Sequence, residues 1–312
     1  MRFGISPLTY DLLIDGILAK KGLEGLSEFR LSDVAKRAAM SGYQHFEIQL
    51  DLFQIFPITM DRNEIKLLRE IKNEFGITYS THLPFLSVDL GGPNKFVREG
   101  SVNSLIDAYN SVVELVDDID VHVLHPTGET VADFFRDWRH RELATTITSP
   151  QIREITTELF SANTIQSIER FVEETNIERS KIALENIEFP FETTIKIIKK
   201  LKTKLCLDTA HVLGGFSGNH DLLEITNKYL DITAEIHLQD FDGENPLSDH
   251  TALGNGTFPP EFLNLIHKKN FGGPVVFELP KDDVIQSIKY IRKNSPQVKI
   301  PDIKDQSFLE RI

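Results

Sequence analysis

Cysteine is almost absent from this chain, which has only Cys206 among its 312 residues. A single cysteine excludes an intrachain disulfide and fits a reducing cytoplasm. Long apolar runs are also missing, because no stretch approaches the roughly 20 residues needed to span a bilayer. The N-terminal residues lack the basic and then apolar layout of a secretory signal peptide. We therefore expect a cytoplasmic protein with no membrane partner.

Positive charge is scarce as well, with 34 lysine and arginine residues against 47 acidic ones and a formal net charge of −13. Non-specific nucleic-acid binding usually leaves a basic footprint, so this balance disfavours a nucleic-acid partner. It does not exclude one, because a metal cluster can supply positive charge locally. Hydrophobic residues make up 40% and charged residues 26% of the chain, as in a globular protein with a sizeable core. The oligomeric state does not follow from the sequence.

Strand-like apolar runs alternate with amphipathic helical patterns along the chain. Strands are predicted at 2–6, 45–50, 77–83, 120–126, 181–187, 204–210, 234–240 and 274–280. Helices are predicted at 31–42, 63–76, 99–117, 191–202, 220–229, 259–269 and 282–293. This alternation predicts parallel strands joined by helical crossovers, and eight strands predict a single α/β domain, a (β/α)8 TIM barrel over residues 1–295. A doubly wound sheet is the alternative, but no glycine-rich fingerprint follows the first strand.

Two connections in this pattern are long. Residues 7–30 follow the first strand, and residues 127–180 form an insertion after the fourth strand. Long loops on a compact domain are often lids or binding elements, so we expect 127–180 to be an extended lid-like segment; a solvated extra helix is the alternative. Its aromatic and basic stretch "DFFRDWRHREL" makes Arg139 a substrate-binding candidate. Residues 296–312 are expected to be a C-terminal extension.

Six of the strand-like runs end in histidine, aspartate or glutamate, the residue types that commonly bind metal ions in proteins. These residues are His82, His125, Glu185, Asp208 with His211, His237, and Glu278. In a TIM barrel the carboxyl ends of all strands meet at one mouth, where the active site lies. Side chains alternate along a strand, so Ala183 and Glu185 share the inward face while Leu184 points outward. We therefore expect these side chains to converge.

Several carboxylates that share one concavity with these histidines repel one another, and they are costly to bury without partners. Divalent cations remove this cost, and mixed histidine and carboxylate sets suit zinc, manganese or iron. The loop "LSDHTALGNG" adds Asp249 and His250 to the candidate ligands. Glu47 and Gln49 share an inward face, either as substrate-binding groups or as part of a polar layer. Glu235 also points inward, as a candidate partner of a metal ligand.

The other five histidines are interpreted as structural or surface residues. They are His45, His122, His140, His220 and His267. His122 has the opposite parity to His125, and the other four lie away from the carboxyl ends of the predicted strands.

The strand-end motifs "ALEN", "CLDTAH", "IHLQD" and "FEL", with "HFEIQL" and "HTALGNG", resemble those of the xylose isomerase-like barrel superfamily over roughly residues 1–295. That superfamily includes sugar isomerases and epimerases and the endonuclease IV branch of apurinic-site nucleases. The epimerase-like members hold one metal, and the resemblance implies that Glu185, Asp208, His237 and Glu278 would hold it here. Asn186, in the same motif as Glu185, is a further substrate-binding candidate.

The endonuclease IV branch has more metal sites, and "THLP" and "LHPTG" resemble its additional strand ends. The resemblance implies a second metal on His82, His125 and a bridging Glu185, and a third on His211, His250 and an acid. The branch has the pattern Asp-x-His in the last loop, whereas this chain has Ser248 at that position and Asp249 beside His250. One to three divalent metal ions per chain are therefore expected.

Three functions remain open. The first is metal-dependent hydrolysis of a phosphoester, with a small phosphodiester, as in cobamide-remodelling phosphodiesterases of the superfamily, favoured over abasic DNA by the acidic charge. There a water between two cations would be the nucleophile. The alternative is a mononuclear sugar or sugar-phosphate isomerase or epimerase, in which Glu185 and Glu278 move a proton on opposite faces of the substrate. A barrel that only binds its ligand is disfavoured by the complete ligand set.

Overall fold

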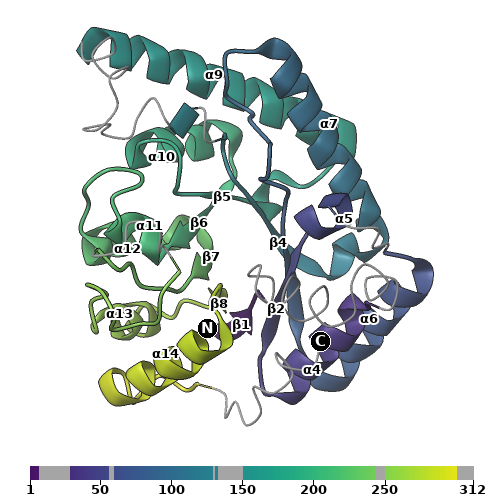
Figure 1. The fold of residues 1–312 in the computed structure, drawn as a ribbon, viewed down its shortest axis with the longest axis vertical. Helices are drawn as coiled ribbons and strands as arrows, with labels where there is room; N and C mark the ends of the chain where they lie inside the picture. The colour runs from purple at the N-terminus through teal and green to yellow at the C-terminus, as the bar shows by residue number, and fades with distance from the viewer. Residues whose placement is uncertain (7–28, 56–59, 129–130, 133–149, 244–249, 301–312) are drawn as a thin grey trace.

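The structure is a computed structural model that describes residues 1–6, 29–55, 60–128, 131–132, 150–243 and 250–300. Its centre is a closed barrel of parallel strands that follow one another in chain order (Figure 1). The strands are β1 (Arg2–Ile5), β2 (His45–Gln49), β3 (Thr78–His82), β4 (Ile119–Leu124), β5 (Ile182–Glu185), β6 (Lys204–Asp208), β7 (Thr233–His237) and β8 (Pro274–Phe277). Pairing of Arg2 with Pro274 joins β1 to β8 and closes the barrel. The predicted TIM barrel is confirmed.

Helices occupy the connections between the strands and lie outside the barrel (Figure 1). The α-helices are α4 (Leu31–Met40), α5 (Asp51–Ile55), α6 (Arg62–Phe75), α7 (Lys95–Ser111), α9 (Pro150–Thr175), α10 (Phe191–Leu201), α11 (Thr209–Leu213), α12 (Leu222–Tyr229), α13 (Phe262–Lys268) and α14 (Lys281–Asn294). Short 3-10 helices are η2 (Val113–Asp118), η4 (Arg179–Lys181) and η5 (Leu230–Ile232). No described helix is long and apolar enough to cross a membrane.

Local sequence signals fix where these helices start and stop. The carboxylate of Asp61 accepts a hydrogen bond from the amide of Glu64 at 2.8 Å and caps α6, as expected of an aspartate that precedes a helix. The helix ends at Gly76, whose φ of 70° is left-handed and favours glycine. The Glu64 carboxylate accepts from the Ser32 hydroxyl at 3.0 Å. This contact ties α6 to the start of α4.

The long connection after β4 contains α9, the helix between β4 and β5. The Ser167 hydroxyl on α9 donates to the carbonyl of Leu90 at 2.8 Å, and Arg170 donates to the side chain of Asn103 on α7 at 2.7 Å. These contacts dock α9 beside α7 and the loop after β3 (Figure 1). Residues 133–149, with Arg139 and His140, lie outside the described residues. The lid-like role of 127–180 stays a prediction.

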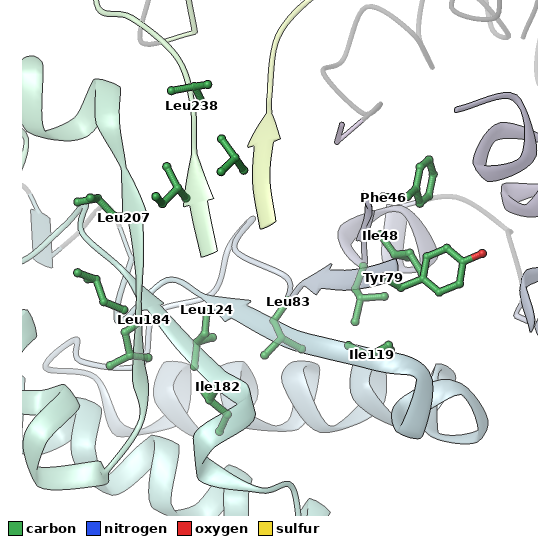
Figure 2. Packing of buried hydrophobic residues seen from close by; sticks show 14 of the residues in the cluster. Phe46, Ile48, Tyr79, Leu83, Ile119, Leu124, Ile182, Leu184, Leu207 and Leu238 are labelled. Carbon is green, nitrogen blue, oxygen red and sulfur yellow. The ribbon is translucent and has the colours of Figure 1, made fainter. Parts of the chain in front are cut away.

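Two apolar layers confirm the parity expected along the strands. Leu184 and Leu207 belong to the large core cluster, part of which Figure 2 shows. Val123, Ala183 and Cys206 form a separate buried cluster. The outward residues therefore pack in one core and the inward residues in another. Side chains at the strand ends with inward parity consequently point into the barrel mouth.

Candidate metal centre

Glu185, the last residue of β5, lies at the centre of the candidate site. Its Oε2 atom is 3.3 Å from Nε2 of His82 and 3.3 Å from Nε2 of His125. Its Oε1 atom is 2.9 Å from Nδ1 of His211. His82 ends β3 and His125 immediately follows β4, so the barrel brings His82 and Glu185 together although 103 positions separate them in sequence. We call His82, His125 and Glu185 the three-ligand position.

His237, the last residue of β7, faces three carboxylates with its Nδ1 atom. That atom is 3.1 Å from Oε2 of Glu278, 3.8 Å from Oε2 of Glu185 and 3.9 Å from Oδ2 of Asp208. We call Glu185, Asp208, His237 and Glu278 the four-ligand position. It shares Glu185 with the three-ligand position. Donor atoms in the two positions form groups close enough for an ion to bind them together. The structure thus brings together all the donors predicted at the strand ends.

The histidines present a particular nitrogen to this centre. The outer nitrogen of each ring meets an oxygen acceptor: Nδ1 of His82 meets the Leu83 carbonyl at 2.9 Å, Nδ1 of His125 meets Oε1 of Glu188 at 2.7 Å, and Nε2 of His237 meets Oε2 of Glu47 at 3.3 Å. Carbonyl and carboxylate oxygens only accept, so each of these contacts stabilises a hydrogen on the outer nitrogen. In the neutral rings, the inner nitrogens then direct their lone pairs at the carboxylates.

Lone pairs aimed at carboxylates repel unless a cation lies between them. The Nδ1 atoms of His211 and His237 are buried and make no hydrogen bond, although carboxylate oxygens lie close to both. Histidine ligands in metalloproteins characteristically give their other nitrogen to a carboxylate or carbonyl. The donor set therefore fits a divalent cation. Nitrogen and oxygen donors in this mixture suit zinc, manganese or iron.

Electrostatics couple the histidines and carboxylates tightly. Burial alone would lower the pKa of His125, but the charges of Glu188 and Glu185 hold it well above its ordinary value. Burial likewise opposes the charged form of His237, yet the surrounding acids raise its pKa well above normal. Burial alone would raise the pKa of Glu185, but His125 and His237 hold it well below its usual range. The carboxylates therefore favour positive charge at this centre, which a bound cation would also supply.

Metal affinity is expected to fall as the pH is lowered. Because the pKa values of His125 and His237 are raised, protons compete with a metal for these rings to a higher pH than usual and are released when the metal binds. Raising the pH removes this competition until it exceeds the raised pKa values. Isothermal titration of Zn²⁺ or Mn²⁺ into metal-free protein between about pH 6 and about pH 8 should show this trend. A pH-independent affinity would contradict it.

The residues predicted to hold a third metal are only partly described by the structure. His211 Nδ1 lies 3.7 Å from Oδ1 of Asp208 in addition to its contact with Glu185. His250 is half-buried, and its Nε2 atom lies 3.7 Å from Oε2 of Glu278. Asp249 lies outside the described residues, so a third metal on His211, His250 and an acid stays a prediction.

The loop that brings His250 to the mouth is organised by Asp240, which follows β7. The Asp240 carboxylate accepts hydrogen bonds from the backbone amides of Phe241, Gly254, Gly256 and Phe258 at 2.8–3.0 Å. Gly254 has a φ of +91°, a conformation that favours glycine. Our sequence analysis missed this role of Asp240. The separation between this aspartate and the amides it binds follows no recognisable spacing, but its place ahead of the glycine-rich "LGNG" was an available signal.

Three of the predicted substrate-binding residues, Glu47, Gln49 and Asn186, are buried. Glu47 is fully buried, and Gln49 Nε2 donates to Ser6 Oγ at 2.9 Å and to Glu47 Oε1 at 3.2 Å. Asn186 is fully buried and bonds both the carbonyl and the amide of Asp208, at 3.0 and 2.8 Å. These contacts match a polar layer beneath the site. Substrate binding by Glu47, Gln49, Asn186 and Arg139 stays a prediction.

Four of the five histidines set aside in the sequence are among the described residues, and these four lie away from the two metal positions. His45 Nε2 is 2.8 Å from Ser80 Oγ in the barrel floor, and burial holds the pKa of His45 well below its usual value. His122 Nδ1 is 2.7 Å from Thr81 Oγ1, and burial lowers the pKa of His122 to about 3. His220 lies beside Phe191, and His267 is exposed on α13.

Glu235 lies in the same barrel floor as His45. Its Oε1 atom accepts from Ser80 Oγ at 3.0 Å, and burial followed by the charge of Glu47 raises its pKa well above normal. It belongs to the group of Glu47, Glu235 and His237 whose donor atoms lie close together. Glu235 thus lies close to His237, a candidate metal ligand. Its position in the strand had indicated that it points into the barrel.

Comparison with known proteins identifies the family. The model of the xylose isomerase-like TIM barrel family matches residues 35–294, and the chain belongs to this family. The match does not single out the endonuclease IV-like branch. No curated protein sequence matches the chain.

Solved structures share the fold at low sequence identity. A D-tagatose 3-epimerase-like protein has 20% identity and a TM-score of 0.61, over 96% of this chain and 100% of that chain. The 3-keto-D-glucoside 4-epimerase YcjR from E. coli has 13% identity and a TM-score of 0.60, over 95% and 99%. A Thermus thermophilus protein soaked with ZnCl2 has 19% identity and a TM-score of 0.51, over 82% and 90%. At these identities the similarity shows the shared fold.

Proposed function

We propose that the protein is a metal-dependent isomerase or epimerase of a small sugar or sugar-like substrate. The observation that supports this best is the four-ligand position, in which Glu185 and Glu278 both approach Nδ1 of His237, at 3.8 and 3.1 Å. The barrel is shared with proteins named as sugar epimerases. A site with one cation and two flanking carboxylates is sufficient for moving a proton beside a carbonyl group.

The chain's own residues supply the proton transfer in this proposal. When bound, the cation polarises the substrate's carbonyl and adjacent hydroxyl oxygens. One of Glu185 and Glu278 takes the proton from the neighbouring carbon, and the other returns a proton to that carbon or to the adjacent one. Glu185 is buried, and Glu278 makes its closest contact with the buried His237. A site that excludes water protects the reactive intermediate between the two transfers.

Aromatic rings beside the metal positions support a carbohydrate ligand. The ring of Phe85 stacks on that of His125, with centroids 4.9 Å apart and an interplanar angle of 21°. The ring of Phe216 meets that of His211 edge-on at 5.3 Å. Both phenylalanines are only half-buried. Half-exposed aromatic faces offer apolar area to the C–H faces of a sugar.

Phosphoester hydrolysis is the second candidate, and the three-ligand position favours it. His82, His125 and Glu185 form a complete set of donors beyond the four-ligand position, with Glu185 common to both. Two cations bridged by one carboxylate suit a metal-activated water that attacks a phosphoester. The net charge of −13 favours a small phosphodiester over DNA within this candidate.

Metal stoichiometry and substrate turnover separate the two candidates. We expect one equivalent of Mn²⁺ or Zn²⁺ per chain, retained in His125→Ala, and conversion of ketose epimers by the wild type. Two equivalents, with one lost in His125→Ala together with hydrolysis of bis-p-nitrophenyl phosphate, would establish the phosphoesterase instead. His267→Ala, on exposed α13, controls for adventitious metal on surface histidines. A protein that binds metal and turns over neither substrate class would contradict both.

A further inference from the structure

Two buried carboxylates outside both metal positions contact ligand histidines from behind. Glu47 is fully buried on β2, and Glu188 is 5% exposed in the connection between β5 and α10. Each meets the ring nitrogen that points away from the cation positions. The two contacts involve different histidines, His237 and His125, and these histidines belong to different positions.

A hydrogen bond from a neighbouring side chain holds the Glu47 carboxylate in place beside His237. Its Oε1 atom accepts from Gln49 Nε2 at 3.2 Å, and the same Gln49 nitrogen donates to Ser6 Oγ at 2.9 Å. This leaves Oε2 of Glu47 at 3.3 Å from Nε2 of His237. A hydrogen on Nε2 leaves the Nδ1 lone pair facing Glu278, 3.1 Å away. With the opposite tautomer, the lone pair would face the Glu47 carboxylate.

Glu188 contacts Nδ1 of its histidine, His125, whereas Glu47 contacts Nε2 of His237. Its Oε1 atom is 2.7 Å from Nδ1 of His125, and the Phe85 ring stacks against the imidazole at 4.9 Å. The ring is therefore held both in its plane and on one face. Its remaining nitrogen, Nε2, lies 3.3 Å from Oε2 of Glu185. His82 differs, because its outer nitrogen meets a main-chain carbonyl.

We propose that Glu47 and Glu188 are positioning residues that each fix the tautomer of one histidine, Glu47 that of His237 in the four-ligand position and Glu188 that of His125 in the three-ligand position. The proposal rests on the metal dependence of the proposed function, though not on its substrate. Carboxylates that hold ligand histidines in this way contribute about 10- to 100-fold to metal affinity. Because the two carboxylates contact different histidines, they should act separately.

The test places both substitutions in a His82→Ala background, which leaves the four-ligand position intact. In that background Glu47→Gln is expected to lower Zn²⁺ affinity by about 10-fold or more in chelator competition. Glu188→Gln, a matched change of acid to amide at a second buried site, is expected to leave the affinity unchanged. If Glu47→Gln binds Zn²⁺ as tightly as its parent, or if both variants lose affinity equally, the proposal is overturned.

A second measurement separates tautomer control from simple damage to the fold. In metal-free wild type at a pH above the raised pKa of His237, where the ring is neutral, ¹⁵N NMR should show its hydrogen on Nε2, and Glu47→Gln should produce a mixture of tautomers. The thermal unfolding midpoint of the metal-free variant should stay close to that of the wild type. A single Nδ1–H tautomer of His237 in the wild type would refute the proposal. Failure to bind any metal would refute the proposed function, while this tautomer measurement would still decide the role of Glu47.

Discussion

Replacing Glu185 with glutamine is expected to lower kcat/KM by at least about 10³-fold, because in the proposed function this side chain is both a metal ligand and one of the two proton-transfer groups. Removing a general acid or base alone costs about 10²- to 10⁴-fold. Oε1 and Oε2 of Glu185 face His211 on one side and His82, His125 and His237 on the other. A glutamine nitrogen at either position would donate toward these rings and displace a ligand atom.

The metal content of Glu185→Gln shows whether the lost activity comes from loss of the metal or only from loss of a proton-transfer group. Glu185→Gln should lose its bound metal in mass-spectrometric analysis of the purified chain, since this carboxylate belongs to both candidate positions. Glu192→Gln, on exposed surface of α10, is the matched control and should keep both activity and metal. If Glu185→Gln kept the metal content and the turnover of the wild type, Glu185 would be neither a metal ligand nor a proton-transfer group.

Replacing Asp240 with alanine is expected to lower the free energy of unfolding by about 3 kcal/mol, because the carboxylate satisfies the amides of four residues in one loop. An unsatisfied buried donor costs about 1–3 kcal/mol, and the amide of Phe258 is buried. The loop also positions His250 near Glu278, so turnover should fall with stability. Chemical denaturation of metal-free protein measures the first effect.

Asp221→Ala is the matched control for this loss. The Asp221 carboxylate caps α12 through one amide, that of Glu224, at 2.8 Å. Loss of a single cap costs about 1 kcal/mol. A loss in Asp240→Ala no larger than that in Asp221→Ala would show that the four bonds do not organise the loop cooperatively.

The barrel could be predicted from sequence because its strands obey a strict alternation. Leu184 and Leu207 point to the helices while Glu185 and Asp208 point into the mouth, as their positions in each strand indicate. In a closed barrel, strand ends share one mouth, so the ligands could be predicted without knowledge of their distances. Parity also separated His122, which lies against Tyr109 of α7, from the site.

Helix α9 was considered only as an alternative to a lid, and its bounds were not predicted; its sequence explains why. Ile152, Ile155 and Leu159 are exposed near its start, so apolar residues do not mark a single buried face there. Later turns bury Phe160 and Phe171. A helix with apolar residues on both faces lacks the clear periodicity on which prediction from sequence depends.

Side-chain contacts between residues far apart in the chain could not be predicted either. Glu188 reaches His125 across 63 positions and Glu47 reaches His237 across 190, and neither pair has a fixed spacing in the sequence. The same motifs served both functional candidates, since Glu185, Asp208, His237 and Glu278 occur in each. The difference between them depends on how many cations the adjoining positions hold.

Closure of the barrel by β1 and β8 has a consequence for any ion held at its mouth. The donors come from β3 through β8 and the segments that directly follow them, so each position takes its donors from several separate strands of the barrel. A captured ion would therefore join strands that are distant in sequence, and the folded chain should resist protease digestion better with the ion bound than without it.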